Sequence, residues 1–183
     1  MMHPVIFVVG PSGSGKDTLL REALAQRPDF HLVRRTITRP ADAGGEDHHA
    51  VSYEEFAGLE VEGAFALSWE AHGLSYGIPN SELERRATGP ILVNASRGVI
   101  DEARERFGPL TVFVVTASLE ILSQRLHSRR REDNANIVRR LERARMAMPT
   151  GEDVITIDNS GPLTAGVSAV VNALDALQKG YAR

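Results

Sequence analysis

The chain has 183 residues, which at roughly 100–200 residues per domain corresponds to one domain with a sizeable core. It contains no cysteine, so disulfides, zinc–thiolate sites, iron–sulfur clusters and thiol nucleophiles are excluded. The net charge is −3, no apolar run approaches the ~20 residues that cross a membrane, and the first residues lack the features of a signal peptide, so a cytoplasmic protein is expected.

Apolar runs alternate with amphipathic helical patterns along the chain. The predicted strands cover residues 5–9, 31–38, 90–94, 110–116 and 154–157, and the predicted helices cover residues 16–26, 82–87, 99–107, 119–129, 136–146 and 163–178. This alternation predicts right-handed βαβ crossovers and therefore an α/β fold, with a parallel sheet and helices on both faces. Residues 39–80 interrupt the alternation, and we interpret them as an insertion that covers one end of the sheet, within a single domain of residues 1–183.

A glycine-rich loop follows the first predicted strand and opens the first predicted helix. It fits the phosphate-loop pattern G-x-x-x-x-G-K and consists of Gly10, Pro11, Ser12, Gly13, Ser14, Gly15, Lys16, Asp17 and Thr18. Its glycines allow successive backbone N–H groups to point at phosphate oxygens, and the helix N-terminus adds partial positive charge. Lys16 is expected to reach the β- and γ-phosphates of ATP and to offset the charge that develops during transfer. The alternative is a glycine-rich turn with a chance lysine, and the agreement of strand, loop, lysine and helix argues against it.

Asp17 departs from this pattern, which has Ser or Thr at the position that ligates Mg²⁺. A carboxylate is also a good Mg²⁺ ligand, directly or through water, so Asp17 is a candidate magnesium ligand. Thr18 could supply the hydroxyl instead. Alternatively, Asp17 only stabilises the helix N-terminus as an acidic residue of the first turn. The sequence leaves these interpretations open.

The ends of two later predicted strands carry residues suited to bind anions. Arg34, Arg35 and Arg39 lie toward the end of the second strand, and Asn94 and Arg97 follow the third. In a doubly wound sheet, ligands bind beyond the carboxyl ends of the strands. Asn94 and Arg97 are therefore expected in the same crevice as the phosphate loop. Since successive side chains of a strand point to opposite faces, only some residues of the second strand can face that crevice.

Arginines cluster between residues 121 and 145, although the chain as a whole is acidic. Such a patch favours a small polyanionic ligand over a nucleic-acid backbone, so small-molecule partners are expected, without nucleic acid or membrane. A charge run is usually a solvated face, but this one is interrupted between two predicted helices, as in lids that close over ATP. Arginines over a transferring phosphoryl group can raise the rate by about 10³–10⁵. We therefore expect a lid at about residues 119–146, in which at least two of Arg125, Arg129, Arg131 and Arg140 act in catalysis.

In the order of its motifs, the chain resembles the guanylate kinase family over nearly its whole length. The resemblance is carried by the phosphate loop, Thr36-Ile37-Thr38-Arg39, His48-His49-Ala50-Val51-Ser52, Tyr76-Gly77, Arg129–Glu132 and Arg140-Leu141. It implies a guanylate-kinase-like P-loop kinase fold, in which the inserted segment binds the acceptor and the arginine-rich segment is the lid. Thr36, Arg39 and Tyr76 fall where guanylate kinases hold the acceptor phosphate.

Several positions depart from the guanylate kinase pattern. A second phosphate-binding arginine is replaced by Asp42 and a phosphate-binding tyrosine by His48, and the acidic residue that reads guanine falls near Leu67. An Asp-x-Asp pair after the third strand is replaced by Val93-Asn94-Ala95. A site that reads a base through hydrogen bonds loses about 10⁴–10⁵ in discrimination without those partners, so GMP is an unfavourable acceptor.

In these departures the chain resembles the ribose 1,5-bisphosphate phosphokinases, a guanylate-kinase-like family of phosphonate metabolism. The resemblance is also carried by Gly15-Lys16-Asp17 and Leu67-Ser68-Trp69. The resemblance implies that ATP phosphorylates the C1 phosphate of α-D-ribose 1,5-bisphosphate, giving 5-phospho-α-D-ribose 1-diphosphate and ADP. An ionised phosphate acceptor needs no general base, so catalysis would depend on positioning and charge neutralisation by Lys16, Mg²⁺ and lid arginines. The acceptor-binding residues expected on this interpretation are Arg35, Thr36, Thr38, Arg39, His48, Tyr76, Asn94 and Arg97.

Other functions stay open at this point. One alternative is a guanylate kinase or another nucleotide kinase, and a second is a non-catalytic guanylate-kinase-like binding module. A binding module would be expected to have a decayed phosphate loop, whereas Gly10, Gly13, Gly15 and Lys16 are intact. The sequence leaves the oligomeric state open, a homodimer included.

Overall fold

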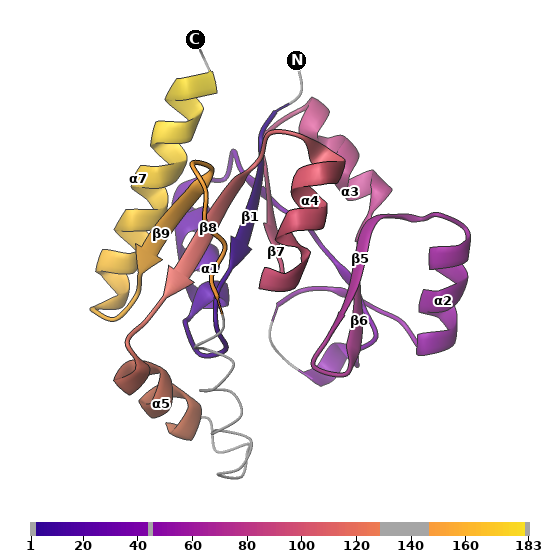
Figure 1. The fold of residues 1–183 in the computed structure, drawn as a ribbon, viewed down its shortest axis with the longest axis horizontal. Coiled ribbons are helices and arrows are strands. Elements are labelled where there is room, and N and C mark those ends of the chain that lie inside the picture. Colours follow the sequence, from indigo (N-terminus) through magenta and orange to yellow (C-terminus); the bar gives the residue numbers. More distant parts are fainter. Residues whose placement is uncertain (1–2, 44–45, 129–146, 182–183) are drawn as a thin grey trace.

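The computed structural model describes residues 3–43, 46–128 and 147–181 of the chain (Figure 1). Its centre is a five-stranded parallel sheet with the strand order β2-β7-β1-β8-β9. The strands are β1 (Val5–Val9), β2 (His31–Leu32), β7 (Ile91–Asn94), β8 (Thr111–Thr116) and β9 (Val154–Asp158). β1 lies in the middle and is buried along its whole length, as a continuous apolar run in a parallel sheet should be.

Alternate side chains of β1 pack into two separate apolar cores. Val5, Phe7 and Val9 belong to the core under α4 (Ile100–Phe107). Ile6 and Val8 belong to the core under α1 (Lys16–Gln26) and α7 (Leu163–Tyr181). Figure 1 shows α1 and α7 on one face of the sheet and α4 on the other. The predicted α/β fold with helices on both faces is therefore confirmed.

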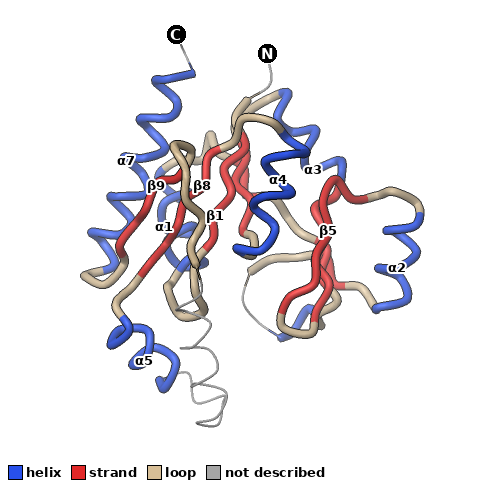
Figure 2. Tube along the Cα trace, viewed as in Figure 1, coloured by secondary structure: helices blue, strands red, loops and turns tan. Residues whose placement is uncertain are grey.

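A second, four-stranded sheet stands beside the first, with the strand order β4-β3-β6-β5 (Figure 2). Its strands are β3 (Thr36–Ile37), β4 (His49–Ala50), β5 (Phe65–Ala71) and β6 (Leu74–Pro79). The helix α2 (Tyr53–Val61) connects β4 to β5 and begins at a capping box formed by Ser52 and Glu55. Leu67 and Ile78 of this small sheet reach the core under α4, which fixes the small sheet against the main one.

The prediction of one strand over residues 31–38 is wrong, because the chain there passes from the main sheet to the small one. Val33 N still donates to Leu92 O at 2.8 Å in the main sheet. At the next residue, Arg34 N donates to the Glu82 carboxylate instead, at 2.9 Å. The chain then enters the small sheet at Thr36 as β3, so this sheet begins before residue 39.

Short helices complete the frame. α3 (Asn80–Glu84) and a 3₁₀ turn (Arg85–Ala87) lead back from the small sheet to β7, and another 3₁₀ turn (Arg97–Val99) precedes α4. α5 (Leu119–Ser128) follows β8, and the predicted helix over residues 136–146 lies outside the described residues. Among the described helices, none combines the length and the apolar character that a membrane span requires.

Candidate active site

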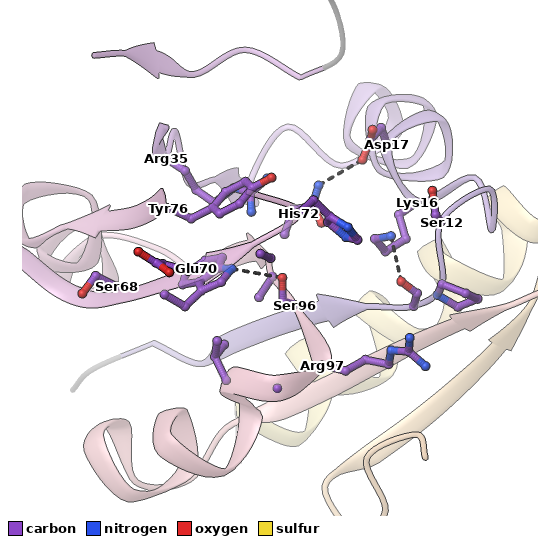
Figure 3. A pocket seen from close by; sticks show the side chains of 18 of the residues that line it. Ser12, Lys16, Asp17, Arg35, Ser68, Glu70, His72, Tyr76, Ser96 and Arg97 are labelled. Atoms are coloured by element: carbon purple, nitrogen blue, oxygen red, sulfur yellow. Dashed lines mark hydrogen bonds between the residues drawn. The ribbon is translucent and has the colours of Figure 1, made fainter. Parts of the chain in front are cut away.

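A pocket of about 690 Å³ lies where the carboxyl ends of β1 and β7 meet the small sheet. Ser12, Lys16 and Asp17 lie on one side of it, and Arg35 and Tyr76 lie on the other (Figure 3). The other predicted residues that line it are Gly10, Pro11, Arg39, Asn94 and Arg97. The pocket therefore brings the phosphate loop together with the ends of the second and third predicted strands.

The phosphate loop takes a backbone path that requires glycine at two positions. Gly10 has a φ of 155°, and a Cβ on it would lie 2.1 Å from the Val115 carbonyl oxygen. Gly15 has a φ of 87°, and a Cβ on it would lie 2.5 Å from Asn159 Nδ2. Both glycines are needed because the loop turns tightly against β8 and against the residue that follows β9.

Two side chains fix the backbone of this loop from outside the pocket. Asn159 Nδ2 donates to the Ser14 carbonyl oxygen at 2.7 Å. Arg125 of α5 donates from Nη1 to the same oxygen at 3.3 Å and from Nη2 to Asn159 O at 2.9 Å. Arg125, expected among the lid arginines, thus contacts the phosphate-loop backbone, whereas Arg129, Arg131 and Arg140 lie outside the described residues.

Lys16 carries the cation of the phosphate loop, and its Nζ donates to Gly10 O at 3.1 Å. Burial lowers the pKa of Lys16, and the neighbouring Asp17 carboxylate acts in the opposite direction. A bound polyphosphate would stabilise the protonated amine in the same way as Asp17 does, since a nearby negative charge favours the charged form.

Arg35 lines the side of the pocket opposite the phosphate loop and is only 7% exposed. Its guanidinium lies 5.0 Å from the centre of the Tyr76 ring and 5.7 Å from that of Trp69, and it forms an ion pair with Glu46. The buried Nε atoms of Arg35 and Arg39 have no hydrogen-bond partner among the described residues. Both arginines line the pocket, and a guanidinium suits a phosphate because it can donate two parallel hydrogen bonds to it.

Tyr76 and Trp69 form the aromatic wall of the pocket. Their rings are stacked with centroids 5.5 Å apart, and Trp69 Nε1 donates to Ser96 Oγ at 3.0 Å. Burial raises the pKa of the Tyr76 hydroxyl, against the opposing effect of Arg35. Tyr76 therefore stays protonated at neutral pH and can donate a hydrogen bond.

Asn94 bridges the two sides of the pocket. Its Nδ2 donates to Asp17 Oδ1 at 3.0 Å and to Glu46 Oε2 at 2.8 Å. The prediction that Asn94 lies near the phosphate loop is therefore confirmed. Glu46 was not predicted, because no motif marks it and only its nearness in sequence to Arg39 could have suggested a role.

Some predicted acceptor residues lie behind the pocket rather than in it. Thr36 and Thr38 are buried in the small sheet, and Thr38 Oγ1 accepts a hydrogen bond from Ser75 N at 2.9 Å. His48 is also buried, with its ring nitrogens 3.0 Å from the carbonyl oxygens of Arg39 and Glu46. These three side chains are placed to support Arg39 and the small sheet.

The described pocket lining differs from the predicted set in both directions. Gly13, Ser14, Gly15 and Thr18 of the phosphate loop are not among the lining residues. Lining residues that were not predicted as site residues include Ser68, Trp69, Glu70, His72, Ser96 and Glu102. Most of them come from the β5–β6 hairpin, whose fold against the phosphate loop is set by tertiary contacts and has no local sequence signal.

Comparison with known proteins gives a consistent result. The guanylate kinase family model matches residues 1–175. A ribose 1,5-bisphosphate phosphokinase PhnN of Agrobacterium fabrum is 45% identical over 174 residues, which cover 93% of this chain and 95% of that protein. A protein of the same name from a Ruegeria species is 49% identical over 167 residues, covering 90% and 87%. Among solved structures, a guanylate kinase from Anaplasma phagocytophilum superposes with a TM-score of 0.66 at 20% identity, over 96% of this chain and 86% of that one, and shares the fold.

Proposed function

The chain belongs to the guanylate kinase family, and from this premise we propose that it is a kinase that uses ATP to phosphorylate ribose 1,5-bisphosphate. The oxygen of the C1 phosphate attacks the γ-phosphorus of ATP, and the bond between that phosphorus and the β–γ bridging oxygen breaks. The products are 5-phospho-α-D-ribose 1-diphosphate and ADP. Because the attacking oxygen is already ionised, no side chain has to remove a proton.

The donor side of the reaction is assigned to the phosphate loop. Its backbone N–H groups would bind the phosphates of ATP, and Lys16 would neutralise charge on the β- and γ-phosphates. The lowered pKa of Lys16 supports this role, because a buried amine gains from an anionic ligand. Arg129, Arg131 and Arg140 are proposed to act from the lid, on the arginine pattern of the sequence and on the family resemblance.

The acceptor side is assigned to the arginines of the small sheet. The observation that carries the proposal is that Arg35 and Arg39 line the same pocket as Lys16 of the phosphate loop. Tyr76 adds a hydroxyl donor and Arg97 a further guanidinium from the loop after β7. A bisphosphate needs several cationic and hydrogen-bond donors, since each of its phosphates carries up to two negative charges.

The residue at the position of the guanine-reading acid is not among those that line the described pocket. Leu67, at the position of the guanine-reading acid, is completely buried in the core under α4. The Asn94 amide is already engaged by Asp17 and Glu46. These features support an acceptor without a base.

Magnesium is proposed to bind at Asp17. The Asp17 carboxylate is exposed at the first turn of α1, and one of its oxygens is held by Asn94, so it can present a hard oxygen ligand toward the phosphates. The described residues contain no cluster of three or more acidic or histidine side chains that could enclose a metal. A single carboxylate can suffice for Mg²⁺, which usually takes one or two carboxylates and completes its shell with phosphates and water. When bound, Mg²⁺ would neutralise negative charge on the phosphates.

The direct test is to incubate the purified protein with ATP and Mg²⁺, offering ribose 1,5-bisphosphate or GMP in parallel, and to identify the products. Turnover of the sugar bisphosphate alone is expected. The Lys16→Met variant is the control for contaminating kinases, and its kcat should be lower by about 10²–10³. Turnover of GMP alone would contradict the proposed acceptor and leave the kinase assignment standing.

A further inference from the structure

Glu46 is the carboxylate on which the two sides of the pocket converge, and it was not expected from the sequence. Its side chain is 14% exposed, and that of its partner Arg35 is 8% exposed. One carboxylate oxygen pairs with Arg35 Nη2, and the other accepts from Asn94 Nδ2 at 2.8 Å. Since Asn94 also binds Asp17, these contacts form a continuous chain from the small sheet to the phosphate-loop helix.

We infer that Glu46 is a positioning residue for the acceptor, holding Arg35 and Asn94 in the arrangement that binds the acceptor's phosphate. This inference rests on the proposed function. Glu46 does not itself line the described pocket, so it acts through Arg35 and Asn94, which do.

The geometry leaves Arg35 able to bind an anion while Glu46 holds it. A guanidinium has five N–H donors, and the pair with Glu46 uses Nη2. Because Arg35 itself lines the pocket, N–H groups of its guanidinium outside this pair remain for a phosphate. Fixing a long, flexible arginine in advance removes an entropic cost that binding would otherwise include.

A purely electrostatic role for Glu46 predicts an effect on acceptor binding opposite to the effect that a positioning role predicts. A carboxylate beside Arg35 partly cancels the positive charge that attracts a phosphate. If this were its main effect, removing the charge would tighten acceptor binding. If Glu46 positions its two partners, the same substitution weakens binding, so the sign of the change separates the two roles.

The Glu46→Gln variant makes this comparison at nearly constant side-chain size. A glutamine has one oxygen and one NH₂ group, so it can accept from Arg35 or from Asn94 and must present a donor to the other. The KM for ribose 1,5-bisphosphate should rise about tenfold or more, which is typical of losing a charge-assisted hydrogen bond. The KM for ATP should change less than about threefold, since the contacts of Glu46 reach the phosphate loop only indirectly, through Asn94.

Asp47→Asn is the matched control. Asp47 is the next residue, carries the same charge and forms an exposed ion pair with Arg34 at 3.0 Å. Such a surface pair contributes little, so both KM values should stay within about twofold of the wild type. A fall or no change in the acceptor's KM in Glu46→Gln would overturn the inference, as would an equal rise in Asp47→Asn.

Glu46→Asp decides the question if Glu46→Gln fails to fold, as judged by circular dichroism. The shorter side chain keeps the charge but cannot reach both partners. A positioning role therefore predicts weaker binding of the acceptor, whereas a charge effect alone predicts binding as in the wild type. Calorimetric titration of each folded variant with the sugar bisphosphate, without ATP, gives Kd independently of turnover. Wild-type protein that binds no sugar bisphosphate would refute the proposed function, whereas variants that bind it as well as the wild type would refute only the role of Glu46.

Discussion

Arg97 reaches the pocket from the loop after β7, where its Nη1 lies 3.7 Å from Met148 Sδ. Burial lowers the pKa of its guanidinium, which an anionic ligand would offset. Arg97→Ala should therefore raise the KM for the acceptor by about tenfold or more, and that for ATP much less. Steady-state kinetics with each substrate varied in turn would measure the ratio.

The control for this substitution is Arg21→Ala. Arg21 is exposed on α1 and pairs with the adjacent Glu22 at 3.0 Å. The loss of Arg21 should leave the KM values for the acceptor and for ATP within about twofold of the wild type. Equal effects of Arg97→Ala on the acceptor and on ATP would indicate a structural role for Arg97.

Asp17 offers a second test at the scale of single residues. In Asp17→Asn the side-chain size is kept but the charge is lost, so a magnesium ligand would be weakened. The Mg²⁺ concentration that gives half-maximal velocity should rise about tenfold or more, because Mg²⁺ prefers carboxylate oxygens.

The alternative role of Asp17 predicts a different outcome. If it only stabilises the N-terminus of α1, the substitution should lower the free energy of unfolding by about 0.3–1 kcal/mol and leave the Mg²⁺ dependence unchanged. Thr18→Val removes the other candidate hydroxyl. A shift in Mg²⁺ dependence in that variant alone would assign the ligand to Thr18.

At the scale of elements, the connection between β1 and α1 depends on the space around Gly10. Gly10→Ala would place a Cβ against the Val115 carbonyl, a backbone atom of β8 that cannot move without disturbing the central sheet. The free energy of unfolding in urea should fall by more than about 1 kcal/mol, and ATP turnover should fall with it.

Gly58 in α2 is the matched control for Gly10. A Cβ at this position meets no atom within 4 Å, and the residue lies inside a regular helix. Gly58→Ala should therefore raise stability by about 0.5–1 kcal/mol. Changes of opposite sign in the free energy of unfolding of the two Gly→Ala variants would show that the backbone path of the phosphate loop requires glycine at residue 10.

Local sequence patterns predict the elements well where a segment is controlled by its own residues. β1 matches its predicted bounds because an uninterrupted apolar run can only be buried on both faces. α1 matches because the phosphate loop fixes its start and Pro28 limits its end. The strand over residues 31–38 was misassigned because Glu82, far along the chain, captures the backbone of Arg34.

The site also has a predictable and an unpredictable part. Asn94 and Arg97 could be found because they follow the carboxyl end of a correctly predicted strand. Arg35 and Arg39 also line the pocket, although the strand predicted over residues 31–38 is two short strands. Glu46 stands in a loop whose position depends on partners from other elements, so nothing in its neighbourhood distinguishes it from Asp47.

At the scale of the whole molecule, Glu82 of α3 binds both β2 and the segment that leads from the main sheet to the small one. It accepts from Arg34 N, and His31 Nε2 of β2 lies 2.6 Å from its carboxylate. Burial alone would raise the pKa of Glu82, but the hydrogen bonds from His31 and Arg34 outweigh it, so the pKa lies below its usual value.

A lowered carboxyl pKa makes stability depend on acid in a defined direction. The contribution of Glu82 is fully present above the pKa of an unfolded glutamate, about 4.3, and is lost as the pH falls through the lower folded value. Urea unfolding between pH 7 and pH 3 should therefore show wild type and Glu82→Gln converging toward the acid end. Curves that stay parallel through this range would contradict the assignment.

Trp69 is the only tryptophan of the chain, and it lines the pocket that we propose binds the acceptor. The tryptophan fluorescence of this protein thus comes from one side chain, which lies beside Tyr76 and Arg35. A colourless sugar phosphate entering the pocket would change the polarity around a single chromophore. The fluorescence of Trp69 would therefore report binding of the proposed acceptor without an added label.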